Sequence, residues 1–459
     1  MKKIWIIIIS ILAAIILAAV VFVKVYTNQV AERVANEKLA QVLEEKQIPL
    51  KWSGLSIRIG HIHWIRLLTK REVIVDGVYV GLDSVAFKKA DDKTEVSLCD
   101  LRVKAHDLRY NIADSTFSFN DSVYSISAED IDFTSPDGLF NLRVGKFSTA
   151  HDGTFVFKNI VGGNTDKPEE HAFKMGKEMA DWAQFQFKEA RISPTNIARM
   201  IKDKKIDIEK VVVHGDQVRV YHDSQFPCKH AKPMPQQALA AIEMPLCIRC
   251  VEAELTTLNV NVTLDGKHAG TLPLYNSSVT ITDISNTPNN VLKAKVTSHF
   301  ANGGPMHLTM NMKQNKRCNF DYHVNVGQTS GENLTDLMMP MLGLQVSCNI
   351  HSIKADFKGD KDTIGGTFCM RYDSLSFYMD KYSPEEHIAK LAGLGNAFAP
   401  IVIQNRNPRK PNAEPQAYTL HSERNPMKPV PEYMLVILCK GIVCTVAPEW
   451  IAKIINEKI

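Results

Sequence analysis

The stretch VIVDGVYVGL, residues 73–82, decides the fold class. Two valines before Gly77 and two after it each recur at every second position. This period of two predicts strands with one apolar face and one polar face. The pattern continues on both sides, in Leu55, Ile57, Ile59, Val96, Leu98, Leu101, Val103, Phe117 and Phe119. Short strands broken by Asp, Asn and Gly predict a meandering antiparallel sheet.

The alternation divides the chain into regions. It covers residues 50–165 and returns over 206–400, where LNVNVTL and MHLTMNM are clear examples. Between them, residues 166–205 have helical composition, with Ser193 as a cap and Pro194 at a first helical position, so we predict a helical insertion. Residues 401–459 begin with a proline-rich polar stretch, which predicts a linker followed by C-terminal helices.

An internal repeat lies in the first β region. LRVKAHDLRY (residues 101–110) aligns with YSISAEDIDF (residues 124–133), and both place Ala, then Asp, at the same positions between apolar residues. A repeat of about two strands suggests stacked hairpins.

The N-terminus carries an uncharged apolar run. Residues 4–23 read IWIIIISILAAIILAAVVFV, and twenty residues of helix span about 30 Å, the thickness of a bilayer's hydrocarbon core. Lys2 and Lys3 precede the run and predict a cytoplasmic N-terminus. A cleaved signal peptide is the alternative, but its apolar run would be shorter. We therefore expect a cytoplasmic stub and transmembrane anchor over residues 1–27.

A juxtamembrane amphipathic helix is predicted over residues 28–49. Asn28 is a plausible N-cap and Pro49 lies just past the end. Its apolar stripe could cap the edge of a sheet, or lie on a membrane surface.

Charge and cysteine content limit the function classes. The net charge of +4 implies no strong attraction to nucleic acid. Nine dispersed cysteines, an odd number, argue against a disulfide-stapled scaffold.

The candidate metal ligands are Cys247 and Cys250 of the CIRC motif, with Cys228 and His230 upstream. Four such ligands could bind zinc, but the spacing is loose and only one CxxC exists. A redox disulfide would need a helix N-terminus in a βαβ unit. Structural thiols or a passive disulfide are therefore favoured, and we predict neither a metal site nor a cofactor.

Two further histidines, His61 and His63, lie on one face of a strand without a third ligand, so satisfied histidines are favoured. No nucleophile elbow, P-loop or zinc-protease motif occurs in the sequence, and we predict no catalytic residues.

An apolar sheet face must be covered. A curled sheet would make that face a groove able to hold acyl chains, whereas predicted helices could instead close it as an ordinary core. The alternation is the same in both cases, so no lipid-binding residue can be named from it.

The layout resembles the AsmA-like family of Gram-negative envelope proteins. The resemblance rests on the anchor, the juxtamembrane helix and strands such as LSIRIGHIHWIRLL, and covers about half of the chain. Residues 306–379 look like the C-terminal part of that family, with a short helix around Leu334 to Leu342 and a turn from Gly359 to Gly366. Cys348 departs from the Gly expected there, and the tail after residue 400 looks like that of Bacteroidetes members.

This resemblance implies a mainly β fold with a long curved antiparallel sheet, forming a groove with a few covering helices. It implies a non-catalytic, single-pass inner-membrane protein whose bulk is periplasmic. Its partners would be the bilayer, through residues 4–23, and phospholipid moved in outer-membrane homeostasis. The alternative is an envelope scaffold that assists outer-membrane protein assembly through protein partners.

Overall fold

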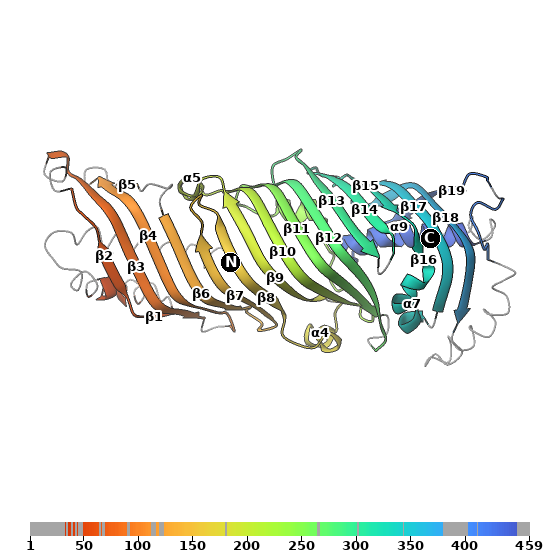
Figure 1. Ribbon diagram of the computed structural model, residues 1–459, viewed down its shortest axis with the longest axis horizontal. Coiled ribbons are helices and arrows are strands. Elements are labelled where there is room, and N and C mark those ends of the chain that lie inside the picture. Colours follow the sequence, from red (N-terminus) through yellow and green to blue (C-terminus); the bar gives the residue numbers. More distant parts are fainter. Residues whose placement is uncertain are drawn as a thin grey trace. The chain divides into compact units, whose positions relative to one another are not determined.

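The computed structural model describes residues 49–447 apart from 64–65, 67–68, 90–91, 112–115, 119–123, 180, 264–266, 301–302, 343, 380–402 and 411, together with residues 33, 35–37, 40, 41 and 44. The structure is mainly β, as predicted, with 59% of residues in strands of a mostly antiparallel open sheet and few helices (Figure 1). The predicted anchor, residues 4–23, lies outside the described residues. Among the helices that are described, none is both long and apolar enough to cross a membrane.

The chain divides into two compact units. Unit 1 comprises Met1–Thr165 and Phe187–Arg199, and unit 2 comprises Asp166–Gln186 and Met200–Ile459.

Unit 1 is an antiparallel meander. Its strands are β1 (Leu50–Ser53), β2 (Ser56–Ile59), β3 (Glu72–Lys88), β4 (Glu95–Asn111), β5 (Thr116–Ser118), β6 (Tyr124–Thr134), β7 (Phe140–Thr149), β8 (Phe155–Asn164) and the later part of β9 (Asp181–Pro194). Strands β1 and β2 both pair with β3, and β3, β4, β6, β7 and β8 then pair in order, each antiparallel to the next. The meander expected from the period of two is confirmed.

The described residues between 33 and 44 are helical. Ala35 is buried in a cluster with Ile57 of β2, and the Trp52 indole donates a hydrogen bond to Asn36 Oδ1 at 2.8 Å. These contacts place this helical segment against the strands that begin unit 1.

Unit 2 contains the one parallel pair among the described strand ladders, between β10 (Ile206–Asp223) and β11 (Leu246–Thr263). The crossover between them, residues 224–245, contains α6 (Pro235–Ala240). The strands that follow β11 are β12 (Ala269–Ser285), β13 (Val291–Phe300), β14 (Pro305–Lys313) and β15 (Phe320–Val326). From β11 to β15, each strand pairs with the next in antiparallel orientation.

The last part of unit 2 includes the predicted short helix. β15 pairs with β17 (Leu344–Gly359), β17 with β18 (Thr363–Met379), and β18 with β19 (Ala417–Glu423). Between β15 and β17 lie β16 (Thr329–Ser330), the 3₁₀ helix η1 (Gly331–Leu334) and α7 (Thr335–Leu342), where the short helix was expected. The final described helix is α9 (Val430–Val446).

The prediction of a helical insertion over residues 166–205 is wrong for the centre of that segment. Two short helices are present, α4 (Pro168–Lys174) and α5 (Ile197–Asp203), but β9 runs between them through Ser193 and Pro194. Its sequence DWAQFQFKEA alternates apolar and polar side chains, and this period outweighs the helix propensity of Ala, Gln, Lys and Glu. The cap of α5 is Asn196, whose Oδ1 accepts a hydrogen bond from the Arg199 N–H at 2.7 Å.

The linker predicted at the start of residues 401–459 is also wrong in part. Ala417–Glu423 forms β19 on the outer side of β18, because Tyr418 and Leu420 continue the alternating pattern and β18 offers an unpaired edge. Asn407 forms an isolated bridge with Tyr372 of β18, and its side-chain amide donates to the Met370 carbonyl at 2.8 Å. The proline spacing predicted a linker, but this segment packs on the sheet.

Positive φ angles recur inside the strands, at Asp100, Asp107, Asp130, Asn159, Asn276, Asp283 and Ser374. Six of these seven residues occupy the third position of an apolar-x-[Asp/Asn/Ser]-apolar sequence. Ala105 and Leu108 lie on either side of Asp107 in β4. Both belong to a buried apolar cluster of unit 1. Register shifts of the kind that a β-bulge makes lie beside Asp100, Asp130, Asn276 and Ser374, and a bulge lets the apolar side chains on both sides of it stay on one face.

Asp107 and Asp130 are equivalent positions of the sequence repeat, with φ of 51° and 47°. The repeat therefore marks two positive-φ positions inside strands.

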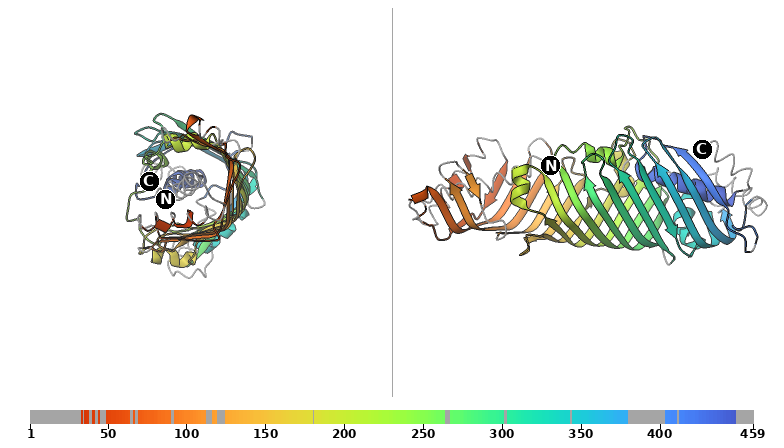
Figure 2. Two further views of the ribbon diagram at one scale, coloured as in Figure 1. Left: turned by 90° about the vertical axis from the view of Figure 1, so that its left-hand side faces the viewer. Right: turned by 90° about the horizontal axis from the view of Figure 1, so that it is seen from above.

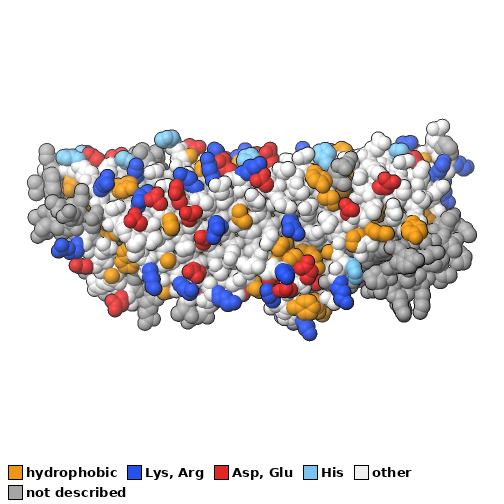
Figure 3. Space-filling model, turned by 60° about the horizontal axis from the view of Figure 1, so that its bottom comes forward, with side chains coloured by type: hydrophobic (Ala, Val, Ile, Leu, Met, Phe, Trp, Pro, Cys, Tyr) orange, Lys and Arg blue, Asp and Glu red, His pale blue; other side chains and the backbone are white. Residues whose placement is uncertain are grey.

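The polar face carries paired charges. In unit 1, Arg143 Nε lies 2.7 Å from Asp132 Oδ1, and Lys146 Nζ lies 3.1 Å from Glu129 Oε1 across neighbouring strands. Figure 3 shows basic and acidic side chains interspersed over the surface. Mixed, paired charge is typical of a solvated face.

Candidate apolar binding face

Apolar side chains form continuous rows across unit 2. Residues directly opposite each other in register share a face of the sheet. One row runs through Val251, Ile281, Ala294, Met310, Tyr322 and Phe357. The next runs through Ala253, Val279, Val296, Leu308, Val324, Ala355 and Phe368. We call the face that carries these rows the inner face.

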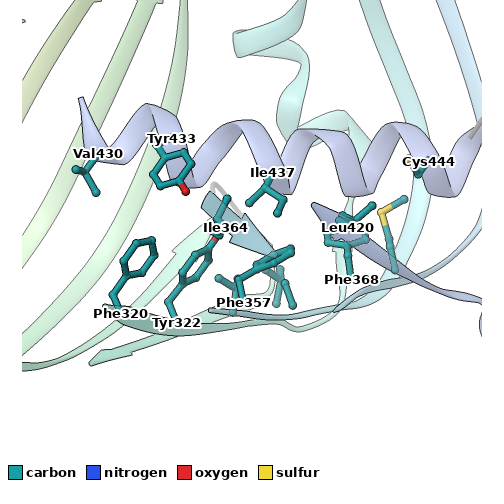
Figure 4. Close-up of a cluster of buried hydrophobic side chains, with 14 of the residues drawn as sticks. Phe320, Tyr322, Phe357, Ile364, Phe368, Leu420, Val430, Tyr433, Ile437 and Cys444 are labelled. Carbon is teal, nitrogen blue, oxygen red and sulfur yellow. The ribbon is translucent and has the colours of Figure 1, made fainter. Parts of the chain in front are cut away.

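Helix α9 covers one part of the inner face, the part formed by β15, β17, β18 and β19. Tyr433, Ile437 and Cys444 of α9 join a buried cluster with the side chains of these strands (Figure 4). The Tyr322 and Phe357 rings lie 5.3 Å apart, and both side chains are fully buried. Figure 2 shows that the strands here curve about the helix, so α9 lies on the concave side.

Hydrogen bonds fasten α9 to the sheet. The Tyr322 hydroxyl donates to the Met434 carbonyl at 3.0 Å, and Lys440 Nζ donates to the His421 carbonyl at 2.6 Å. The Tyr372 hydroxyl donates to the Gln404 carbonyl at 2.7 Å, and more weakly to the Thr445 carbonyl. Burial raises the pKa of Tyr322 and of Tyr372 and lowers the pKa of Lys440. These tyrosines stay neutral and act as hydrogen-bond donors.

The other part of the inner face, on β11 to β13, lies outside the cluster that α9 covers, and α7 contacts the same strands β11 and β12. Val260 pairs with Leu272, and Leu258 lies opposite Leu274 in the same register. Val260, Leu258 and Leu272 are only half-buried. Among the described residues, the buried cluster beneath α9 does not extend to these three. Half-exposed apolar side chains in consecutive positions form a surface that can bind an apolar ligand.

The first turn of α9 carries two buried polar atoms without hydrogen-bond partners among the described residues, Glu432 Oε2 and the Tyr433 hydroxyl. Arg424 Nε, before the helix, and Asp223 Oδ2, at the end of β10, are two others. An unpartnered buried polar atom on α9 reduces the stability of the docked helix.

The structure does not gather the sequence candidates for a metal site. Cys247 and Cys250 lie half-buried on β11, and Cys250 Sγ is 3.8 Å from Glu252 Oε1. Cys228 Sγ contacts Met179 Sδ at 3.6 Å, and His230 is exposed on the crossover. Burial raises the pKa of Cys228 and of Cys250, which disfavours the thiolate. In the part of the chain that is described, no three His, Cys, Asp or Glu side chains gather to hold a metal ion.

The His61 and His63 rings lie 5.4 Å apart on either side of Ile62, which forms a bridge with Val75 of β3. His63 Nε2 is 2.6 Å from Asp76 Oδ1, on the exposed surface. This carboxylate is a hydrogen-bond partner for the imidazole, as expected for a satisfied histidine.

Sequence reasoning did not identify the residues of the inner face in unit 2. The alternating pattern marks them, but the positive-φ residues Asn276 and Asp283 interrupt it along β12. The apolar-x-Asp-apolar spacing could have located the interruption at Asp283, whereas Asn276 is followed by Ser277 and lacks that spacing.

Comparison of the chain with protein-family models, with curated proteins and with solved structures found no match.

Proposed function

We propose that this chain is a membrane-anchored, AsmA-like envelope protein that binds phospholipid through its acyl chains. Residues 4–23 would cross the inner membrane, with the N-terminus cytoplasmic and the β-rich part periplasmic. The observation that carries the proposal is the half-buried apolar surface on β11 and β12, where Val251, Ala253, Val279 and Ile281 are in register with the rows that α9 covers.

The chemistry of this face suits an acyl chain. Its rows contain aliphatic side chains, whereas the opposite face carries the ion pairs. Burying a methylene contributes about 0.8 kcal/mol, so a chain of about sixteen carbons could gain on the order of 10 kcal/mol before the costs of ordering it. Binding would then need no catalytic group and no cofactor.

A direct test replaces one inner side chain by a charge. Val260→Lys places an ammonium on the inner face, and Asn259→Lys places the same group on the opposite face of the same strand. We expect full-length protein, purified in mild detergent, to carry phospholipid in native mass spectrometry. Val260→Lys should lose most of that lipid, and Asn259→Lys should keep it.

Circular dichroism and thermal unfolding serve as the folding control for both variants. A folded wild-type protein free of lipid, which also fails to take up phospholipid from vesicles, would overturn the proposal. Equal lipid content in the two variants would place the lipid elsewhere.

An envelope scaffold is the second candidate. It is favoured by the part of the inner face that α9 fills, because that part is a closed protein core. Cross-linking to stable protein partners, with no lipid bound, is the result that would support it.

A further inference from the structure

We propose that α9 is a displaceable plug, which occupies part of the same apolar track that binds acyl chains and leaves it when lipid fills the track. The inference rests on the proposed function and concerns its regulation. It starts from the registers, because the rows beneath α9 continue without a break to the half-buried Val251, Ala253, Val279 and Ile281 on β11 and β12.

The first argument is the composition of α9 on its outward side. Leu435 is 55% exposed and Val443 is 44% exposed, and Val436 and Ile442 are exposed beside them. A helix that only caps a core normally presents polar residues to solvent. Because α9 is apolar on both sides, it is suited to surroundings in which acyl chains contact it all round.

The second argument is the way α9 is fastened. Its contact with the sheet is apolar side-chain packing plus hydrogen bonds to its carbonyls from Tyr322 and, weakly, Tyr372, and one from its Lys440 to the His421 carbonyl. No disulfide holds it, since none of the cysteines in the described region is paired with another cysteine. An acyl chain can replace such packing with contacts of the same kind.

The third argument is the pair of unpartnered buried polar atoms in the first turn of the helix. Glu432 and Tyr433 each bury a polar atom without a partner in the described structure. Undocking would return these atoms to water and would offset part of the packing lost. The start of α9 is therefore the end from which release would begin.

The test uses a lock and a loosened variant of the full-length protein. A Cβ built on Gly441 would lie 2.4 Å from Phe368 Cγ, so Phe368→Cys with Gly441→Cys places two thiols within reach of a disulfide. Oxidation locks α9 and reduction frees it in the same preparation. The loosened variant is Tyr322→Phe with Tyr372→Phe, which removes the two hydroxyls. Its matched control is Tyr378→Phe, because Tyr378 is half-exposed.

The readouts are lipid stoichiometry and amide exchange. Each protein is incubated with vesicles of phosphatidylethanolamine and phosphatidylglycerol, then examined by native mass spectrometry and by hydrogen exchange of the 430–446 peptide. We expect lipid to accelerate exchange in α9 of the wild type and of Tyr378→Phe. The oxidised lock should carry fewer lipids per chain than its reduced form, and the loosened variant at least as many as the wild type.

Two results would overturn the plug. Equal stoichiometry in the oxidised and reduced lock, with α9 equally protected with and without lipid, would leave lipid binding intact but show that α9 is a fixed part of the core. Absence of lipid from every variant, including the reduced lock, would remove the proposed function together with the plug.

Discussion

At the scale of single residues, the αL positions inside strands shape this fold most strongly. Asp130 is exposed, yet its φ of 47° is one that most side chains avoid. Asp and Asn tolerate this conformation because their short polar side chains can hydrogen-bond locally. In β6, Asp130 lets Ala128 and Ile131 both point to the apolar side of the strand.

We expect Asp130→Val to lower the free energy of unfolding by about 1–2 kcal/mol, since a β-branched side chain is strained at positive φ. Asp130→Gly should be nearly neutral. Asn141→Val, at an exposed position of β7 with ordinary φ, is the control and should change stability by less than about 0.5 kcal/mol. Urea unfolding measures all three, and equal losses for the two Val variants would contradict the bulge argument.

A second residue-scale prediction concerns pH. The hydrogen bond to Asp181 raises the pKa of His222 above its usual range, against the opposing effect of burial. A raised folded-state pKa stabilises the fold below the unfolded pKa of about 6.5, and this contribution is lost as pH rises through the folded value. The stability difference between wild type and His222→Gln should therefore be larger at pH 6 than well above the folded pKa. A difference that grows with pH would contradict the assignment.

At the scale of elements, α9 packs closely against Phe368 of β18 at its residue Gly441. Gly441 faces the Phe368 ring so closely that a Cβ would lie 2.4 Å from Phe368 Cγ. In an exposed helix, Gly→Ala gains up to about 1 kcal/mol of helix propensity. Here steric overlap of the new methyl with Phe368 opposes that gain and makes the net change in stability unfavourable.

We therefore expect Gly441→Ala to destabilise the protein by about 1–3 kcal/mol, measured by thermal unfolding. Adding Phe368→Leu should recover part of the loss, because the shorter side chain leaves room for the new methyl. Ile442→Ala, on the outward side of the same helix turn, is the control and should have a smaller effect. A stabilising Gly441→Ala would show that the helix is free to shift.

At the scale of the molecule, unit 2 combines a covered and a half-covered apolar face. An added ligand that binds only the folded protein must raise its stability by mass action. Acyl binding should therefore be visible as a shift in unfolding temperature even before the lipid is identified.

We expect palmitate, added below its aggregation concentration to delipidated full-length protein, to raise the unfolding temperature in a concentration-dependent way. At a hundred times the dissociation constant the gain would be about 2.7 kcal/mol. Asn259→Lys should respond like the wild type, and Val260→Lys should not respond. A response that is unchanged in Val260→Lys would move the ligand away from the inner face.

The alternation around Gly77 and in LNVNVTL determined that the chain is mainly β and antiparallel, because a period of two requires a strand with two different faces. Local sequence also located the helix at Thr335–Leu342. It failed at β9 and β19, where Ala, Gln and Pro suggested other structures and pairing with a neighbouring strand prevailed.

Only the tertiary structure decided which apolar residues are covered. Tyr322 and Val260 share the same alternating pattern, yet one is fully buried under α9 and the other is half-buried. The difference depends on where α9, far away in the sequence, comes to rest. A sequence pattern reports which way a side chain faces on its own strand, whereas burial depends on packing against distant segments.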